Sequence, residues 1–228
     1  MNKGLIIFAR EPVPGKVKTR LARDIGDKSA ADIYSAMLGD IINQTSTLKD
    51  IRVLIFWSLE NEPFPAINAT AHLGVFRQKG SDLGERMANA FSTAFANDIN
   101  ACCIIGSDSP DLPVDFITQA FTNLACDETD IVYGPTEDGG YYLLGMKQLW
   151  QRIFENIPWS SPAVLNTTRA RIDELKLNGK SLPIWYDIDT LADLQQLAAG
   201  SESSAPLTRT AFQSVFPHVH SSRNTGTI

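Results

Sequence analysis

Positively charged residues gather in one short segment of an otherwise acidic chain. Five of the 20 Lys and Arg residues fall between Arg10 and Arg23, where two prolines and Gly15 favour turns. Glycine lets the backbone approach phosphate oxygens, while Lys and Arg supply the compensating charge. The segment is not a Walker A loop, because Gly15-Lys16 is followed by Val17. We expect a phosphate-binding loop, with a solvated charged loop as the alternative. The candidate phosphate-binding residues are Arg10, Gly15, Lys18 and Arg20.

Aspartates follow two of the apolar runs in the chain. Asp108 and Asp111 come directly after one run, and Asp187 and Asp189 come after the last one. Carboxylate oxygens suit Mg²⁺ or Mn²⁺, which completes its shell with phosphate oxygens and water. Aspartates beside a proline also serve in turns and caps, so Asp108 alone does not decide between the two roles. Because two strand ends can converge on one cation, we expect a metal site that uses Asp108 and Asp189.

A second pair of carboxylates, Glu137 and Asp138, precedes two glycines between two further apolar runs. A carboxylate in such a place can act as a general base toward an acceptor hydroxyl when it comes within hydrogen-bond reach. Asp-Gly-Gly is equally a sequence of hairpin turns. The catalytic and the structural interpretations therefore both stay open for this pair.

Other residues could contact the rest of a nucleotide or its acceptor. Trp159 precedes two serines, and it could stack on a sugar or a base, whereas the serines could cap a helix. The stretch from Gly80 to Arg86 is a second region expected to shape substrate choice. We expect Asp82 and Arg86 to contact the nucleotide, and Tyr141 and Trp159 to line an acceptor pocket.

Short apolar runs alternate along the chain with segments of helical period. The runs fall at residues 5–9, 51–57, 74–78, 101–106, 131–133, 141–144 and 182–186, and helices are predicted at 29–48, after Ser81, at 114–125, 147–154 and 162–177, and up to about residue 199. This alternation is typical of an α/β domain with a mostly parallel sheet flanked by helices. In such a sheet ligands bind beyond the carboxyl ends of the strands, where the basic segment and the aspartates fall.

Composition and charge exclude several classes of protein. The 228 residues are 43% hydrophobic and 20% charged, as expected for one folded domain. A net charge of −6 argues against a nucleic-acid partner or an anionic membrane surface. The apolar runs are too short to span a bilayer and no signal peptide is recognisable, so we expect a cytoplasmic protein. Three cysteines without C-x-x-C spacing predict buried, reduced thiols.

Four segments in order, at residues 8–21, 106–113, 134–142 and 187–190, carry a resemblance to a known family. They resemble the radical-SAM/selenodomain-associated transferase 1 family of the nucleotide-diphospho-sugar transferase (GT-A) superfamily. The resemblance implies a single-domain, Rossmann-like GT-A fold with a mostly parallel mixed sheet, which binds a nucleotide and a divalent cation. Asp108 lies at the place of the superfamily's Asp-x-Asp metal motif, but serines flank it, so one carboxylate of that motif is missing. Asp189 is therefore expected to contribute more to binding the cation. We therefore predict a transferase domain over residues 1–200 and a C-terminal tail or extension over residues 201–228.

The resemblance implies a metal-dependent glycosyltransferase that uses a nucleoside-diphosphate sugar and a small-molecule acceptor. Arg10, Lys18 and Arg20 would hold the diphosphate, a Mg²⁺ or Mn²⁺ ion would assist departure of the leaving group, and Glu137 or Asp138 would deprotonate the acceptor. The segments at residues 18–21 and 187–190 are also similar to guanylyltransferase-like nucleotidyltransferases, which release pyrophosphate from an NTP. A nucleotide-binding protein without turnover is the third hypothesis. The sequence does not identify the sugar, base, acceptor or oligomeric state.

Overall fold

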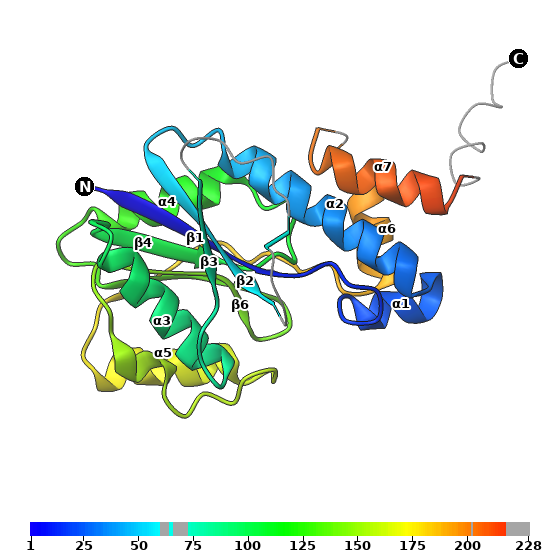
Figure 1. Ribbon diagram of the computed structural model, residues 1–228. Coiled ribbons are helices and arrows are strands. Elements are labelled where there is room, and N and C mark those ends of the chain that lie inside the picture. The colour runs from blue at the N-terminus through cyan, green and yellow to red at the C-terminus, as the bar shows by residue number, and fades with distance from the viewer. Residues whose placement is uncertain (60–63, 66–72, 202, 218–228) are drawn as a thin grey trace, which may run out of the picture.

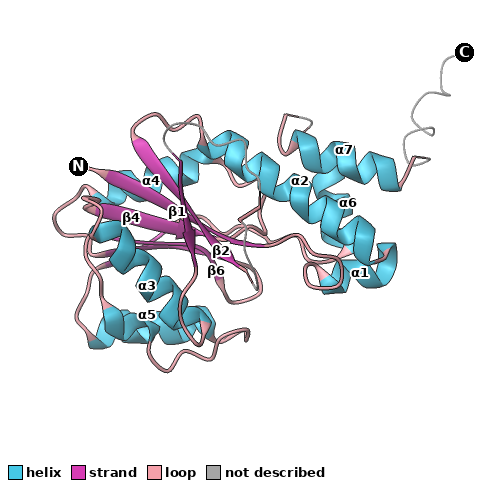
Figure 2. Cartoon of the chain, in the orientation of Figure 1, coloured by secondary structure: helices cyan, strands magenta, loops and turns pink. Residues whose placement is uncertain are grey.

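A seven-stranded sheet runs through the molecule with helices on both faces (Figure 1 and Figure 2). The computed structural model describes residues 1–59, 64–65, 73–201 and 203–217. The strand order is β3-β2-β1-β4-β6-β5-β7. The strands are β1 (Lys3–Arg10), β2 (Ile51–Ser58), β3 (Leu73–Arg77), β4 (Ala101–Ile105), β5 (Ile131–Pro135), β6 (Tyr141–Met146) and β7 (Gly179–Ser181).

Most neighbouring strands in this sheet are parallel. β1 pairs in parallel with β2 and β4, β2 with β3, and β5 with β7, whereas β6 is antiparallel to both β4 and β5. The prediction of a mostly parallel mixed sheet is confirmed. Ile7 of β1 lies opposite Ile105 of β4, so Arg10 and Asp108, which come just beyond these positions, reach the same edge of the sheet.

Each face of the sheet packs against its own helices. The covering elements are α2 (Asp27–Thr45), α3 (Leu83–Phe95), α4 (Val114–Leu124), the 3₁₀ turn η1 (Gln151–Phe154) and α5 (Val164–Glu174). Leu5 and Ile7 pack with apolar residues of α2 and α4, while Ile6 between them packs with residues of α3, η1 and α5. A strand covered on both faces must be apolar throughout, which explains the unbroken apolar run at residues 5–9.

Four helices gather beyond the carboxyl end of β1, at the right of Figure 1: α2 with α1 (Thr19–Ile25), α6 (Leu191–Ala199) and α7 (Pro206–Val215). They share a core that includes Leu21, Ile33, Leu194 and Phe212. Helix α1 begins directly after Lys18, and α6 begins two residues after Asp189. The packing of this helical group therefore fixes where two predicted site residues lie.

Helix α7 lies within the segment that we expected to be a tail or extension. Asp40 of α2 is buried and accepts hydrogen bonds from the backbone N–H groups of Leu207 and Thr208 at 2.9 and 2.8 Å, and from Thr208 Oγ1 at 2.7 Å. These contacts satisfy backbone donors at the start of the helix. Asp40 is 167 positions away from Leu207, so these contacts are not visible in the sequence, whereas Pro206 at the start of α7 is a local helix signal that the prediction did not use. Residues 202 and 218–228 of the segment lie outside the described residues.

Several local predictions are wrong. The strand predicted at residues 182–186 lies earlier, as β7, because Pro183 has no N–H for a ladder, and only Trp185 forms an isolated bridge with Thr136. The helix predicted at residues 147–154 is limited to η1, since a short segment gains little from helix propagation. The basic segment was expected to be a loop, but its last five residues, from Thr19 to Arg23, belong to α1.

The cysteines and the membrane prediction can also be compared with the structure. All three thiols are free, and Cys102 and Cys103 are buried in β4, but Cys126 is exposed, contrary to the prediction. It lies just past the end of α4, where the chain turns toward β5 at the surface. In the described part of the chain, no helix is both long and apolar enough to cross a membrane.

Candidate functional site

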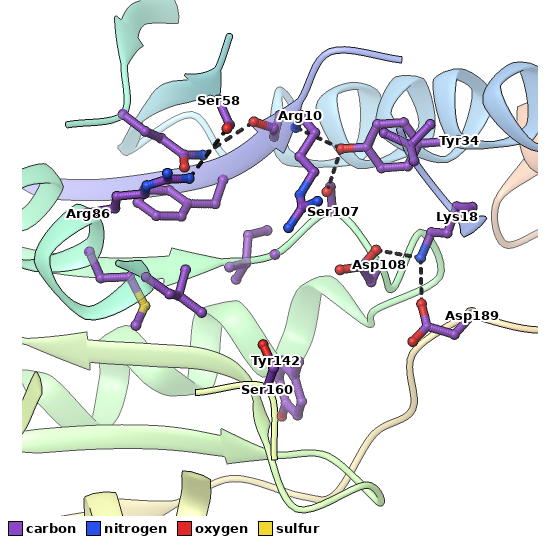
Figure 3. Close-up of a pocket in the computed structure, with 18 of the residues that line it drawn as sticks. Arg10, Lys18, Tyr34, Ser58, Arg86, Ser107, Asp108, Tyr142, Ser160 and Asp189 are labelled. Carbon is purple, nitrogen blue, oxygen red and sulfur yellow. Dashed lines mark hydrogen bonds and ion pairs between the residues drawn. The ribbon is translucent and has the colours of Figure 1, made fainter. Parts of the chain in front are cut away.

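A pocket of about 810 Å³ opens beyond the carboxyl ends of β1 and β4. Its walls come from these strand ends, the starts of α1 and α3, one residue of α2, part of β6 and the segment before α6 (Figure 3). Residues from distant parts of the sequence thus meet there, as the parallel sheet predicted. The predicted site residues that line it are Arg10, Lys18, Arg20, Asp82, Arg86, Asp108, Tyr141 and Asp189.

Lys18 lies between the two aspartates of the predicted metal site (Figure 3). Its Nζ donates hydrogen bonds to Asp108 Oδ1, to Asp189 Oδ1 at 3.1 Å and to the Ile188 carbonyl at 2.6 Å. An ammonium has three donors, so these acceptors use all of them. The Lys18 side chain is 3% exposed, whereas the Asp108 and Asp189 side chains are 46% and 43% exposed. Burial acts to lower the pKa of Lys18, but the two carboxylates outweigh it and raise the pKa.

The local backbone explains why Lys18 lies there. Val17 is buried against Ala31 and Tyr34 of α2, which anchors the loop between β1 and α1. Lys18 follows with φ 46° and ψ 45°, in the left-handed region that non-glycine residues seldom adopt, and serves as the N-cap residue of α1. On the other side, the Ile188 N–H donates to the Asp108 carbonyl at 2.9 Å, which joins the two aspartate-bearing segments.

A capping box fixes the backbone that follows Asp189. The Thr190 side chain accepts a hydrogen bond from the Asp193 N–H, and the Asp193 carboxylate accepts from the Thr190 N–H at 2.7 Å. The same carboxylate accepts from the Asp189 N–H at 3.0 Å. Buried Ile188 anchors the residue before it. The position of Asp189 is therefore set from both sides.

Tyr34 is a pocket residue that we did not predict from the sequence. Its Oη accepts a hydrogen bond from the Arg10 N–H at 2.9 Å and lies 2.8 Å from Ser107 Oγ (Figure 3). Burial raises the pKa of this hydroxyl, so it stays protonated. The side chain joins the end of β1 to the residue before Asp108. The helical period of the sequence places Tyr34 beside the core face of its helix. Because a buried tyrosine hydroxyl needs a hydrogen-bond partner, this position was the signal that could have identified Tyr34.

Three arginines bring positive charge to the pocket. The Arg10 side chain points into it from the end of β1 (Figure 3). Arg20 is 70% exposed, with its nearest guanidinium nitrogen 3.5 Å from Asp189 Oδ2. Arg86 of α3 donates to the Gly80 carbonyl at 3.2 Å and to Ser58 Oγ at 3.5 Å.

Asp82 is the N-cap of α3, where its Oδ1 accepts from the Glu85 N–H at 2.8 Å.

Four predicted site residues do not line this pocket: Gly15, Glu137, Asp138 and Trp159. Asp138 Oδ1 accepts hydrogen bonds from Thr136 Oγ1 at 2.6 Å and from the Gly140 N–H at 3.0 Å, so it closes the turn between β5 and β6. Trp159 packs against the start of α3, where a Cβ on Gly84 would come within 2.8 Å of its ring. The roles proposed for these four residues stay predictions.

Two further aspartates near the sheet edge have partners of their own. Asp187 accepts a hydrogen bond from Ser109 Oγ at 2.9 Å. Burial, and secondly the charge of Asp108, raise the pKa of Asp187 to about 6. Asp111 accepts from the Tyr186 hydroxyl and lies 3.4 Å from Trp185 Nε1. Asp187 and Asp111 therefore support the segment that carries Asp189 without lining the pocket.

Within the described residues, no group of three or more His, Cys, Asp or Glu side chains could hold a metal ion. Two carboxylates, Asp108 and Asp189, do converge on one point at the wall of the pocket. Mg²⁺ is usually held by one or two protein carboxylates together with phosphate oxygens and water. The donor set therefore fits an ion that arrives with a phosphate-bearing ligand, and does not fit a cage made by the protein alone.

Comparison with solved structures shows the fold. A protein of Desulfovibrio desulfuricans G20, provisionally assigned as a nucleotide-diphospho-sugar transferase, is 29% identical with a TM-score of 0.85, over 93% of this chain and 94% of that one. A cytidylyltransferase from Leptospira borgpetersenii serovar Hardjo-bovis is 15% identical with a TM-score of 0.53, over 100% and 99%. The 4-diphosphocytidyl-2C-methyl-D-erythritol synthase of Anaerococcus prevotii is 9% identical with a TM-score of 0.55, over 93% and 100%. The last two likenesses support the fold alone.

Family comparison gives the classification of the chain. A comparison with curated proteins found no match. Residues 41–161, which span β2 to β6, match the model of a family described as "Uncharacterized protein conserved in bacteria (DUF2064)". This match covers more than half of the chain. The chain has the fold of the nucleotide-diphospho-sugar transferases, and it belongs to the DUF2064 family.

Proposed function

We propose that the protein is a transferase that binds a nucleoside-diphosphate sugar in the pocket and passes the glycosyl group to a small-molecule acceptor. The observation that carries the proposal is the meeting of three arginines and two half-exposed aspartates at the carboxyl ends of β1 and β4. A diphosphate needs positive charge around its oxygens, and this edge of the sheet is where such a fold binds ligands. The fold shared with the Desulfovibrio protein supports the same class.

Arg10, Arg20 and Arg86 are the residues proposed to hold the diphosphate. They approach the pocket from β1, α1 and α3, so a bound phosphate chain would be contacted from three sides. Guanidinium groups suit this task because they form paired, charge-assisted hydrogen bonds with phosphate oxygens. Lys18 differs from them, because its three donors are already used by the protein.

Asp108 and Asp189 are the residues that would hold a Mg²⁺ or Mn²⁺ ion. Such an ion would supply Lewis-acid assistance by neutralising charge on the departing diphosphate. The arginines add to this stabilisation, because they face the pocket where that charge develops. Electrostatic stabilisation of the leaving group is therefore the main catalytic contribution that we assign to this chain.

Nucleotidyl transfer is the second candidate, and one observation favours it. Glu137 and Asp138, the carboxylates expected to activate an acceptor hydroxyl, lie outside the lining of the pocket. A phosphate nucleophile is already ionised and needs no base. The same arginines would then hold the triphosphate of an NTP, and pyrophosphate would leave.

The experiment is a thermal-shift panel of nucleoside diphosphates, triphosphates and nucleotide sugars, with and without Mg²⁺ or Mn²⁺. A ligand at 100 times its Kd stabilises the native state by about 2.7 kcal/mol, which gives a clear rise in melting temperature. The stabilising ligands are then incubated with candidate acceptors, and the products are analysed. Release of a nucleoside diphosphate supports glycosyl transfer, and release of pyrophosphate supports nucleotidyl transfer. Binding without turnover would indicate a binding protein, and no stabilisation by any nucleotide would overturn the proposal.

A further inference from the structure

We propose that the Lys18 ammonium is a built-in cation that holds Asp108 and Asp189 together, so that a divalent cation binds these carboxylates only by displacing it. Lys18 is then a positioning residue in the free protein, rather than a standing phosphate ligand. The identity of the incoming ion rests on the proposed function. The contacts of Lys18 do not.

The first support is the use of all three donors of the ammonium. Two donors go to the carboxylates of Asp108 and Asp189, and the third goes to the carbonyl of Ile188, the residue before Asp189. Asp189 and Asp108 approach the same nitrogen from segments 81 positions apart, since they lie 171 and 90 positions from Lys18. One buried side chain therefore holds two segments together.

The second support is that the backbone presents Lys18 in this position. Val17 is buried and packed on α2, and Lys18 itself has a positive φ at the start of α1. The loop is thus anchored on both sides of the ammonium's attachment point. Without the ammonium, two carboxylates at this spacing would repel one another.

The third support concerns charge. A divalent cation on the inner oxygens of Asp108 and Asp189 would lie against the ammonium, because those oxygens are the ones that contact Nζ. Two positive ions in such contact repel strongly, so the ion binds there only after it displaces the lysine, and this displacement weakens its apparent affinity. Lysine has a flexible stem, and Lys18 is part of the pocket wall. A displaced ammonium would therefore face the space in which a ligand phosphate would lie.

The test is a titration with Mn²⁺ alone, without nucleotide, in which electron paramagnetic resonance reports the free ion. The variants are Lys18→Met and, as a matched control, Arg86→Met. Arg86→Met removes the same unit of charge from the same pocket, but Arg86 contacts Gly80 and Ser58 rather than the aspartates. The wild type should bind Mn²⁺ weakly. Lys18→Met should bind at least about tenfold more tightly, because the competing charge is gone and Asp108 has lost its ion pair, while Arg20 stays 3.5 Å from Asp189 in both proteins.

The control decides how the result is interpreted. Arg86→Met should stay within about threefold of the wild type, since Arg86 contacts Gly80 and Ser58 and neither of the two aspartates. Equal affinity of Lys18→Met and the wild type, or equal tightening in both variants, would overturn the proposal. Lys18→Gln, which keeps two N–H donors without the charge, is measured in parallel by the same criterion, so a Lys18→Met protein that fails to fold does not end the test.

This outcome is independent of the proposed function. The titration contains no nucleotide, so tighter Mn²⁺ binding by Lys18→Met would stand even if no nucleotide stabilised the protein in the thermal-shift panel. Conversely, nucleotide binding with no effect of Lys18→Met on Mn²⁺ affinity would leave the proposed function in place and remove the role assigned to Lys18.

Discussion

Two regions at the same end of the sheet carry aspartates whose hydrogen-bond partners differ. Asp108, after β4, contacts Lys18, which is 90 positions away in the sequence, and its half-exposed side chain lines the pocket. Asp138, between β5 and β6, contacts Thr136 and Gly140, each two positions away. The first aspartate joins distant segments around a space, and the second closes its own turn. Residue type alone therefore does not identify a catalytic carboxylate. The separation in sequence between each aspartate and its hydrogen-bond partners distinguishes Asp108 from Asp138.

The largest effect should follow Asp108→Asn. The change removes a negative charge from the wall of the pocket and one of the two carboxylates that would hold the cation. We expect transfer to slow by about 100- to 1,000-fold, which is the usual cost of losing one electrostatic contributor to leaving-group stabilisation. Steady-state rates with the donor found in the panel measure it. Asp108→Asn turnover close to that of the wild type would contradict the comparison.

Asp187 offers the next largest effect, as a dependence of stability on pH. Its folded pKa of about 6 lies above the ordinary value of 3.8, so the folded protein keeps a proton that the unfolded chain releases near pH 4. The stability from this group is present below about pH 4 and lost as the pH rises through 6. In EDTA, Asp187→Asn should therefore gain about 2–3 kcal/mol over the wild type between pH 4 and 8, measured by urea unfolding. A constant difference across that range would refute the assignment.

Arg10→Met tests the positive side of the pocket. The loss of one charge-assisted contact to a phosphate should weaken nucleotide binding about tenfold, with a larger effect on KM than on kcat. Arg23→Met is the matched control, because Arg23 belongs to the same basic segment but does not line the pocket. Calorimetric titration of both variants measures the difference. Equal weakening would mean that the net charge of the segment, rather than the pocket, attracts the nucleotide.

The smallest effect should follow Asp138→Ala. The change removes two local hydrogen bonds in the turn between β5 and β6, so unfolding free energy should fall by about 1 kcal/mol. Nucleotide affinity should stay within about twofold, because Asp138 does not line the pocket. Urea unfolding and calorimetry give the two values. A large loss of nucleotide affinity with unchanged stability would show that the turn belongs to the binding site.

Much of the fold could be predicted because buried strands are apolar on both faces. The run at residues 5–9 became β1, and the runs at 101–106 and 141–144 became β4 and β6. Helix α7 was not predicted, although Pro206 at its start is a local helix signal; the contacts that Asp40 of the distant helix α2 makes with its first turn are not visible in the sequence. The strand at 182–186 was misplaced because the ladder ends before Pro183.

The meeting of distant residues at one edge of the sheet could be predicted where topology alone decides it. A parallel sheet brings its strand ends together, so the meeting of Arg10 with Asp108 and Asp189 followed from the order of the runs. The contacts of Lys18 did not follow, because they depend on a left-handed backbone and on burial, which no spacing reveals. Tyr34 was missed because its two hydrogen-bond partners, Arg10 and Ser107, lie at the ends of two different strands, β1 and β4.

The measurement that tests the central claim most directly is backbone amide hydrogen exchange with and without the most stabilising nucleotide, in the presence of Mg²⁺. Binding slows exchange where it orders the backbone. We predict protection at residues 10–20, 106–109 and 187–190, and no change at residues 136–140. Protection confined to the turn at 136–140, or located away from the ends of β1 and β4, would contradict the account.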